Sequence, residues 1–170
     1  MTDRSTLISR TIADEPGIHF NALVRRLNLA PGQVQYYLRR LLQEGDVVEE
    51  PLYGRTHYYH PNYDASDRRS IAVLRRETAR DVLVYLLEYG PASPATVTDA
   101  LDIARSTLEW HLGHLEEQSL VEKQRDQQGH VTLVATRPAE TLRFLGDIEP
   151  TMTSRLTDRF TRLVDRLLSE

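Results

Sequence analysis

The sequence predicts a mainly α-helical chain with small β-hairpins, built from two copies of one small domain and a helical tail. Three observations indicate this fold class. Apolar residues recur at helical spacing between Ala30 and Gly45. Short extended segments, separated by a turn, follow this helix. The apolar pattern then returns 74 positions later, where Val97 stands at the place equivalent to Leu23.

The composition is that of a globular protein. Of the 170 residues, 40% are hydrophobic and 27% charged, and no apolar run reaches the roughly 18 residues of a membrane span. The absence of cysteine excludes disulfides, thiolate metal sites and a cysteine nucleophile. The N-terminus lacks the pattern of a signal peptide. We therefore expect a cytoplasmic protein with no membrane partner.

Arginine supplies almost all of the positive charge. Lys123 is the only lysine among 21 basic residues, and the net charge is −4. Arginine is more weakly hydrated than lysine and binds bidentately, so this composition indicates a halophilic or high-GC source. DNA-binding domains are usually basic overall, but a net charge of −4 is mild for a high-salt cytoplasm. The charge therefore neither favours nor excludes DNA binding.

Three helices are predicted at the start of the first copy. Residues 3–14 form the first, which a proline-glycine pair ends, and residues 18–20 follow as a short strand. Asn21 is the predicted N-cap of the second helix. The turn Asn28–Ala30 leads into the third, Pro31–Glu44, whose proline suits the first helical turn. Two short helices joined by such a turn form a helix-turn-helix motif.

The helix Pro31–Glu44 has an apolar and a polar face. The polar face carries amides, an aromatic ring and two guanidinium groups: Gln33, Gln35, Tyr36, Arg39 and Arg40. Arginine pairs with guanine or phosphate, glutamine pairs with adenine, and tyrosine reaches a phosphate or a thymine methyl group. We predict that this helix reads the major groove of double-stranded DNA. An ordinary surface helix, which would be equally soluble, is the alternative.

A β-hairpin is predicted directly after this helix. Residues 46–50 and 55–60 form its strands, and Pro51–Gly54 form its tip. A hairpin in this place is a wing, and Arg55 stands where a wing enters a minor groove. Residues 61–70, rich in Asn, Asp and Ser, are predicted to link the two copies. The chain thus divides into winged helix-turn-helix domains at residues 1–63 and 64–137 and a helical tail at 138–170.

The second copy has a different polar face on its reading helix. Glu109, Trp110, Gly113 and His114 stand at the places of Gln35, Tyr36, Arg39 and Arg40. Because phosphates repel a carboxylate, the second copy is predicted to be a spacer, a dimerisation module or a ligand-binding module. The alternative, a second DNA contact, depends on Arg105, Ser106, Thr107, Trp110, Lys123 and Arg125.

Heptad spacing marks the tail. Its apolar residues step by four, three and four, at Leu156, Phe160, Leu163 and Leu167. This narrow seam predicts pairing with a second subunit, and hence a homodimer. Packing of the tail on its own domain is the alternative.

The sequence predicts no enzyme, cofactor or metal site. His57 and His60 point to opposite faces of a strand, whereas His111 and His114 have helical spacing but no clear third ligand. A nucleotide-binding glycine loop is absent, and no Ser-His-Asp layout has supporting context.

The segments HFNALVRRLNLAPGQVQYYLRRL and RSTLEWHLGHLEEQSLVEK resemble the reading helices of archaeal winged helix-turn-helix regulators. The two copies and the tail together resemble the tandem winged-helix predicted transcriptional regulators of halophilic archaea. In such families the reading helix has the pattern Ser/Thr-x-Val-Ser-x-His-Leu. The first copy departs from it at Gly32, Gln35 and Tyr37. The second keeps Ser106, Thr107, His111 and Leu112 but has Glu109 for the second serine.

The resemblance implies a DNA-binding transcriptional regulator. A tandem winged-helix scaffold that binds protein, as in chromosome-segregation or polymerase-associated factors, is the alternative. The acidic net charge and Glu109 favour the scaffold, whereas Arg39, Arg40 and Arg55 on one side of the first copy favour DNA. Neither the operator sequence nor a small-molecule effector follows from the sequence.

Overall fold

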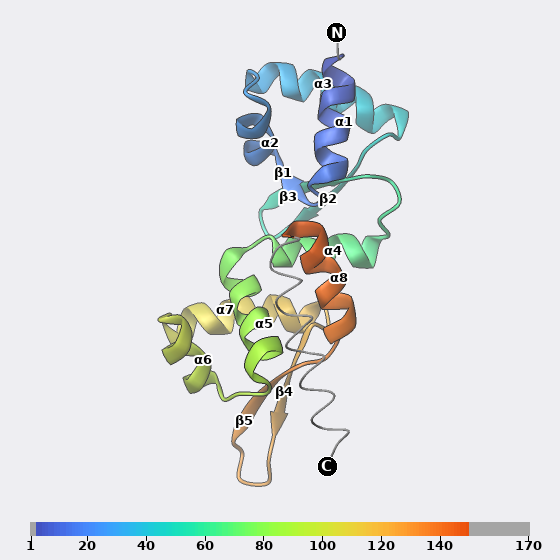
Figure 1. Cartoon of the computed structure of the whole chain (residues 1–170). Helices are drawn as coiled ribbons and strands as arrows, with labels where there is room; N and C mark the ends of the chain where they lie inside the picture. The colour runs from blue at the N-terminus through green and yellow to red at the C-terminus, as the bar shows by residue number, and fades with distance from the viewer. Residues whose placement is uncertain (1–2, 150–170) are drawn as a thin grey trace. The chain divides into compact units, whose positions relative to one another are not determined.

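The computed structural model describes residues 3–149, and the chain divides between Ala72 and Val73 into two compact units. The first unit has the element order helix, strand, two helices, two strands and helix (Figure 1). Its elements are α1 (Arg4–Asp14), β1 (Ile18–His19), α2 (Phe20–Leu27), α3 (Pro31–Glu44), β2 (Val48–Leu52), β3 (Arg55–Tyr59) and α4 (Ala65–Leu74), whose last two residues fall in the second unit.

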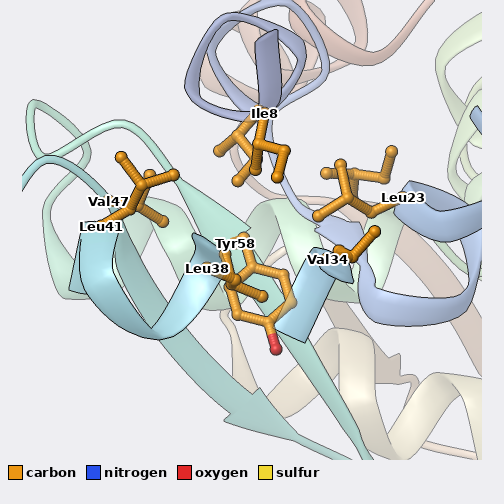
Figure 2. Packing of buried hydrophobic residues seen from close by; sticks show 9 residues of the cluster. Ile8, Leu23, Val34, Leu38, Leu41, Val47 and Tyr58 are labelled. Carbon is orange, nitrogen blue, oxygen red and sulfur yellow. The ribbon is translucent and has the colours of Figure 1, made fainter. Parts of the chain in front are cut away.

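The core of the first unit joins its three N-terminal helices to the hairpin. Figure 2 shows Ile8 of α1 opposite Leu23 of α2 and the buried face of α3. That face consists of Val34, Leu38 and Leu41, which are at most 3% exposed. Their spacing places them on one side of a helix, so burying them turns the other side of α3 outward. The polar face predicted to read DNA is therefore exposed because of this packing.

A three-stranded antiparallel sheet in the order β1-β3-β2 completes the first unit. Leu52 pairs with Arg55, so only Tyr53 and Gly54 lie in the turn between β2 and β3. Both have positive φ, 49° and 80°, as a two-residue type I′ hairpin turn requires. The predicted hairpin is confirmed, with a tip shorter than the expected Pro51–Gly54.

The predicted N-cap of α2 was wrong. Asn21 lies inside α2, which begins at Phe20 after His19. His19 still pairs with His57 in the sheet, so it is both the last residue of β1 and the N-cap position of α2, where its side chain makes no capping hydrogen bond. In the second unit the equivalent helix has a regular cap, because the Ser93 hydroxyl accepts a hydrogen bond from the Thr96 N–H at 3.1 Å.

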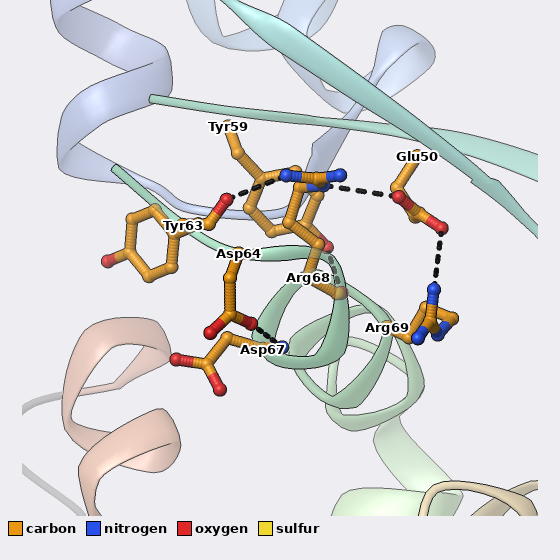
Figure 3. A network of polar contacts seen from close by, with 7 residues as sticks. All are labelled: Glu50, Tyr59, Tyr63, Asp64, Asp67, Arg68 and Arg69. Carbon is orange, nitrogen blue, oxygen red and sulfur yellow. Dashed lines mark hydrogen bonds and ion pairs between the residues drawn. The ribbon is translucent and has the colours of Figure 1, made fainter. Parts of the chain in front are cut away.

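The segment predicted to be a linker, residues 61–70, is largely helical, and most of it belongs to α4. The Asp64 carboxylate accepts a hydrogen bond from the Asp67 N–H at 2.8 Å and so caps this helix. The polar residues of this segment thus hold a helix in place rather than forming only a connection between the two copies. The Tyr59 hydroxyl donates to the Arg68 carbonyl at 2.6 Å (Figure 3).

A partly buried carboxylate also joins α4 to the hairpin. Glu50 of β2 accepts a hydrogen bond from Arg68 Nε at 3.1 Å, and its other oxygen lies 3.7 Å from Arg69 Nη1 (Figure 3). The side chains of Glu50 and Arg68 are 16% and 19% exposed. Water screens this pair less than a pair at the surface, so the contact contributes to holding α4 on the wing.

The second unit repeats this order. Its elements are α5 (Glu77–Tyr89), α6 (Pro94–Leu101), α7 (Arg105–Glu117), β4 (Val121–Arg125), β5 (Val131–Ala135) and α8 (Pro138–Ile148). The bridge between Ala92 and Leu133 takes the place of β1, and α8 follows the hairpin as α4 does. The repeat thus includes a helix after each wing. The predicted fold class, mainly helical with small antiparallel sheets and two helix-turn-helix domains, is confirmed for the described residues.

We predict that Glu50→Gln destabilises the first unit by about 1–2 kcal/mol, because two guanidinium groups lose a partly buried charged partner. Urea unfolding followed by circular dichroism measures this change. Glu49→Gln is the matched control, since Glu49 lies on the same strand but is exposed, and surface changes usually stay within about 0.5 kcal/mol. Equal stability of the two variants would contradict the role of Glu50.

Candidate nucleic-acid interface

The outer face of α3 displays all five side chains that the sequence predicts for DNA reading. Gln33, Gln35, Tyr36, Arg39 and Arg40 are exposed, and Tyr36 is 60% exposed. The Tyr36 ring meets the Tyr37 ring edge-on, with 5.2 Å between the ring centroids. Tyr37 is half-buried and packs against the core, so Tyr36 points outward and Tyr37 partly inward.

Arg39 and Arg40 differ in their surroundings. Arg39 forms no ion pair with any residue that the structure describes, whereas Arg40 lies 3.8 Å from Glu44, one turn further along the helix. Both members of that pair are more than half exposed, so the contact is weak. Arg39 is therefore the arginine of this face with the fewest competing contacts.

An open hollow beside α3 brings Gln35 and Arg39 next to the sheet. It is lined by Phe20, Pro31, Gln35, Leu38, Arg39, Leu42 and Tyr58. Burial, followed by the nearby Glu49 carboxylate, raises the pKa of the Tyr58 phenol. Tyr58 therefore stays a neutral hydroxyl, which adds no negative charge beside the two α3 side chains.

Arg55 lies at the first position of β3, directly after the two-residue turn. It is exposed and has no ion pair within residues 3–149. The wing therefore presents a guanidinium group at its tip, a group suited to phosphates and to narrow minor grooves.

In the second unit, a cation on α7 and a cation on β4 are both engaged by an acid. Glu109 of α7 accepts a hydrogen bond from Arg105 Nε at 2.9 Å and one from Lys123 Nζ at 2.7 Å. The bond from Lys123, with that from Arg105, lowers the pKa of the Glu109 carboxyl. Ser106, Thr107 and Arg125 are exposed. Two of the six residues predicted for a second DNA contact, Arg105 and Lys123, thus neutralise a carboxylate of their own unit.

Trp110 occupies an aromatic and cationic cluster. Trp110 is 49% exposed, and the Arg76 guanidinium carbon lies 5.2 Å from the centroid of its ring. The His114 and His111 rings meet it edge-on at 4.2 and 4.8 Å. No sequence signal places Arg76 in this cluster, because this residue precedes α5 and shares no periodicity with α7.

Metal binding receives no support from the described residues, among which no group of three potential ligands occurs. His57 is buried and its Nδ1 lies 2.7 Å from the Gly17 carbonyl, to which it donates. His60, by contrast, is exposed. Within the same part of the chain, no helix has the length and apolar character needed to cross a membrane. The four predicted seam residues Leu156, Phe160, Leu163 and Leu167 lie outside the described residues.

These features define a protein with two winged helix-turn-helix domains, one in each unit. Family models agree: residues 2–71 match an N-terminal HTH domain, and residues 74–124 match a helix-turn-helix domain. Over 127 residues the chain is 26% identical to an uncharacterized HTH-type transcriptional regulator of Methanocaldococcus jannaschii. That match covers 74% of this chain and 32% of the relative, so the chain spans about a third of the relative's length.

Solved structures give only distant likenesses. Reduced AbfR bound to DNA has a TM-score of 0.41 at 16% identity, over 85% of this chain and 96% of that one. Disulfide-formed AbfR has a TM-score of 0.38 at 16% identity, over 62% and 83%. The mRNA-binding domain of E. coli elongation factor SelB, in complex with SECIS RNA, has a TM-score of 0.30 at 17% identity, over 79% and 99%. Likenesses at this level do not bear on function.

We predict that Arg76→Ala raises the pKa values of His111 and His114. Burial is the first cause that lowers both pKa values, and the Arg76 charge is the second. The substitution removes the second cause, while Glu117 continues to raise the pKa of His114. NMR titration of the imidazole signals of the wild type and of Arg76→Ala measures the shifts.

The lowered pKa values of His111 and His114 also make the free energy of unfolding depend on pH. Their pKa values are below 6.5 in the folded chain, so the unfolded chain binds more protons and stability falls as the pH drops below about 6.5. Thermal melts at pH 5 and pH 7.5 should show a smaller loss for Arg76→Ala than for the wild type. An unchanged pH dependence would contradict this assignment.

Proposed function

We propose that this protein is a DNA-binding transcriptional regulator whose first winged helix reads the major groove with α3. The observation that carries the proposal is the pairing of an exposed Gln-Tyr-Arg face on α3 with Arg55 at the wing tip. Within the described residues, neither Arg39 nor Arg55 has an ion-pair partner, so DNA phosphates meet no internal competitor there. The two helix-turn-helix domains support the proposal.

Each exposed side chain has a distinct proposed role. Gln33 and Gln35, near the start of α3, reach base edges, because the N-terminal residues of a recognition helix enter the groove most deeply. Arg39 and Arg40, further along, contact phosphates, and Tyr36 contacts a phosphate or a thymine methyl group. Arg55 contacts the minor groove or the backbone. The regulator in Methanocaldococcus jannaschii is similar enough in sequence to support a role in transcription.

We predict that Arg39→Ala weakens binding to all DNA sequences alike, whereas Gln35→Ala relaxes the preference at one base position by about 1–3 kcal/mol. Selection from a random duplex library with the full chain first supplies the binding site. Titrations across salt then measure affinity, and loss of one phosphate contact should flatten the salt slope by about one unit.

Arg10→Ala is the matched control, because it removes the same charge from an exposed position on α1, away from the reading face. It should leave affinity and salt slope nearly unchanged. If Arg39→Ala and Arg55→Ala bind as the wild type does at every salt concentration, the scaffold function becomes the better account.

We further propose that the protein is a homodimer, paired through the heptad seam of the tail. A dimer of this kind would bind two half-sites one helical turn, or a multiple of it, apart. The support is the sequence pattern alone, since the seam lies outside the described residues. We predict that Leu163→Asp combined with Leu167→Asp halves the mass measured by light scattering and leaves the helical signal nearly unchanged. An unchanged mass would exclude the seam as the dimer contact.

A further inference from the structure

The second unit carries two cations at places where the first unit has none. By the internal repeat, Arg105 stands at the place of Pro31, and Lys123 at the place of Glu49. Arg105 is the first residue of α7 and Lys123 lies on β4. Positive charges at the start of a recognition helix and on a wing strand can bind the phosphates of a DNA backbone. The second unit also carries an acid near these cations, because Glu109 stands at the place of the neutral Gln35.

The carboxylate of Glu109 engages each cation with a different oxygen. Arg105 Nε lies 2.9 Å from Oε1, and Lys123 Nζ lies 2.7 Å from Oε2. A phosphate group of DNA would offer the same kind of acceptor, two anionic oxygens close together, to the same donors. The three side chains remain accessible, since 58% of Arg105, 37% of Glu109 and 25% of Lys123 is exposed. The site is therefore built at the surface rather than inside the core.

We infer that Glu109 is an internal stand-in for a DNA phosphate, and that it keeps the second winged helix from binding DNA. It does so in two ways: it occupies the two cations, and it places a negative charge on the face that would meet the backbone. Arg105 and Lys123 together form a latent phosphate-binding site. The inference rests on the proposed function only in taking duplex DNA as the ligand.

The inhibition of DNA binding by Glu109 does not change with pH near neutrality. The hydrogen bond from Lys123, with that from Arg105, lowers the pKa of the Glu109 carboxyl, so the group stays ionised well below pH 7. Protonation thus does not release the two cations in the physiological range. Removing the charge by substitution is the direct way to expose the site.

The test uses the full chain carrying Arg39→Ala and Arg55→Ala, which suppresses the proposed contacts of the first unit. Adding Glu109→Gln should tighten binding to a mixed-sequence 30-base-pair duplex by roughly tenfold at 0.1 M salt, because two phosphates are newly neutralised. The salt slope should steepen by up to about 1.8, or about 0.9 for each phosphate. Glu109→Ala should give a similar gain, and circular dichroism checks that each variant is folded.

Two controls separate this mechanism from a general effect of charge. Glu122→Gln makes the same charge change next to Lys123 on β4, at an exposed position with no ion pair among the described residues, and should give less than a twofold gain. Adding Arg105→Ala and Lys123→Ala to Glu109→Gln should abolish the gain. A gain that survives loss of both cations, or that Glu122→Gln reproduces, would overturn the inference, as would no gain from Glu109→Gln and Glu109→Ala.

The same measurements distinguish failure of the proposed function from failure of the inference about Glu109. If the first unit does not bind DNA, the wild type and the Arg39→Ala, Arg55→Ala chain bind equally weakly, while Glu109→Gln still increases affinity in both. If only the present inference fails, the wild type binds DNA through Arg39 and Arg55, and Glu109→Gln leaves affinity unchanged in both chains.

Discussion

The burial of one face of α3 against α1 is the contact on which the first unit depends. Val34, Leu38 and Leu41 are almost completely buried opposite Ile8. An apolar face of this size contributes several kcal/mol when it leaves water, at about 25 cal/mol per Å². Because the side chains of a helix radiate in fixed directions, packing this face against α1 also decides which side chains remain outside. The proposed reading face is thus a direct consequence of the core.

The same packing occurs in the second unit, yet the outer faces of the two helices differ. Leu108, Leu112 and Leu115 of α7 are fully buried, as the equivalent residues of α3 are. On its other side α7 carries Glu109, bonded to Arg105 and Lys123. Core residues are held by volume and hydrophobicity, whereas exposed residues are free to change. Two copies of one fold can therefore diverge in electrostatics without any loss of structure.

Each wing is followed by a helix, and in the first unit that helix is held by polar contacts. Glu50 meets Arg68 and Arg69 of α4, and the Tyr59 hydroxyl bonds to the α4 backbone. These bonds tie α4 to the hairpin that presents Arg55. A change in the position of α4 would thus reach the wing through these few bonds. Substitution of Glu50 or Tyr59 would break them.

The sequence by itself determined the helices of the two helix-turn-helix motifs, the hairpins and the repeat, because each leaves a local signal. Helical periodicity marks α3 and α7, and the 74-residue shift aligns their buried residues. Exposure of the five α3 residues also followed from periodicity. The role of these residues stays a prediction, since exposure shows which side chains are available but not what they bind.

Only the tertiary structure decided the contacts between residues far apart in the chain. Lys123 reaches Glu109 across 14 positions, and Arg68 reaches Glu50 across 18. Neither pair has a periodic signature, because a strand and a helix approach each other only once the core has formed. For this reason most of a polar segment predicted to be a linker belongs to α4. Two cations of the alternative second DNA contact are likewise bonded to an acid.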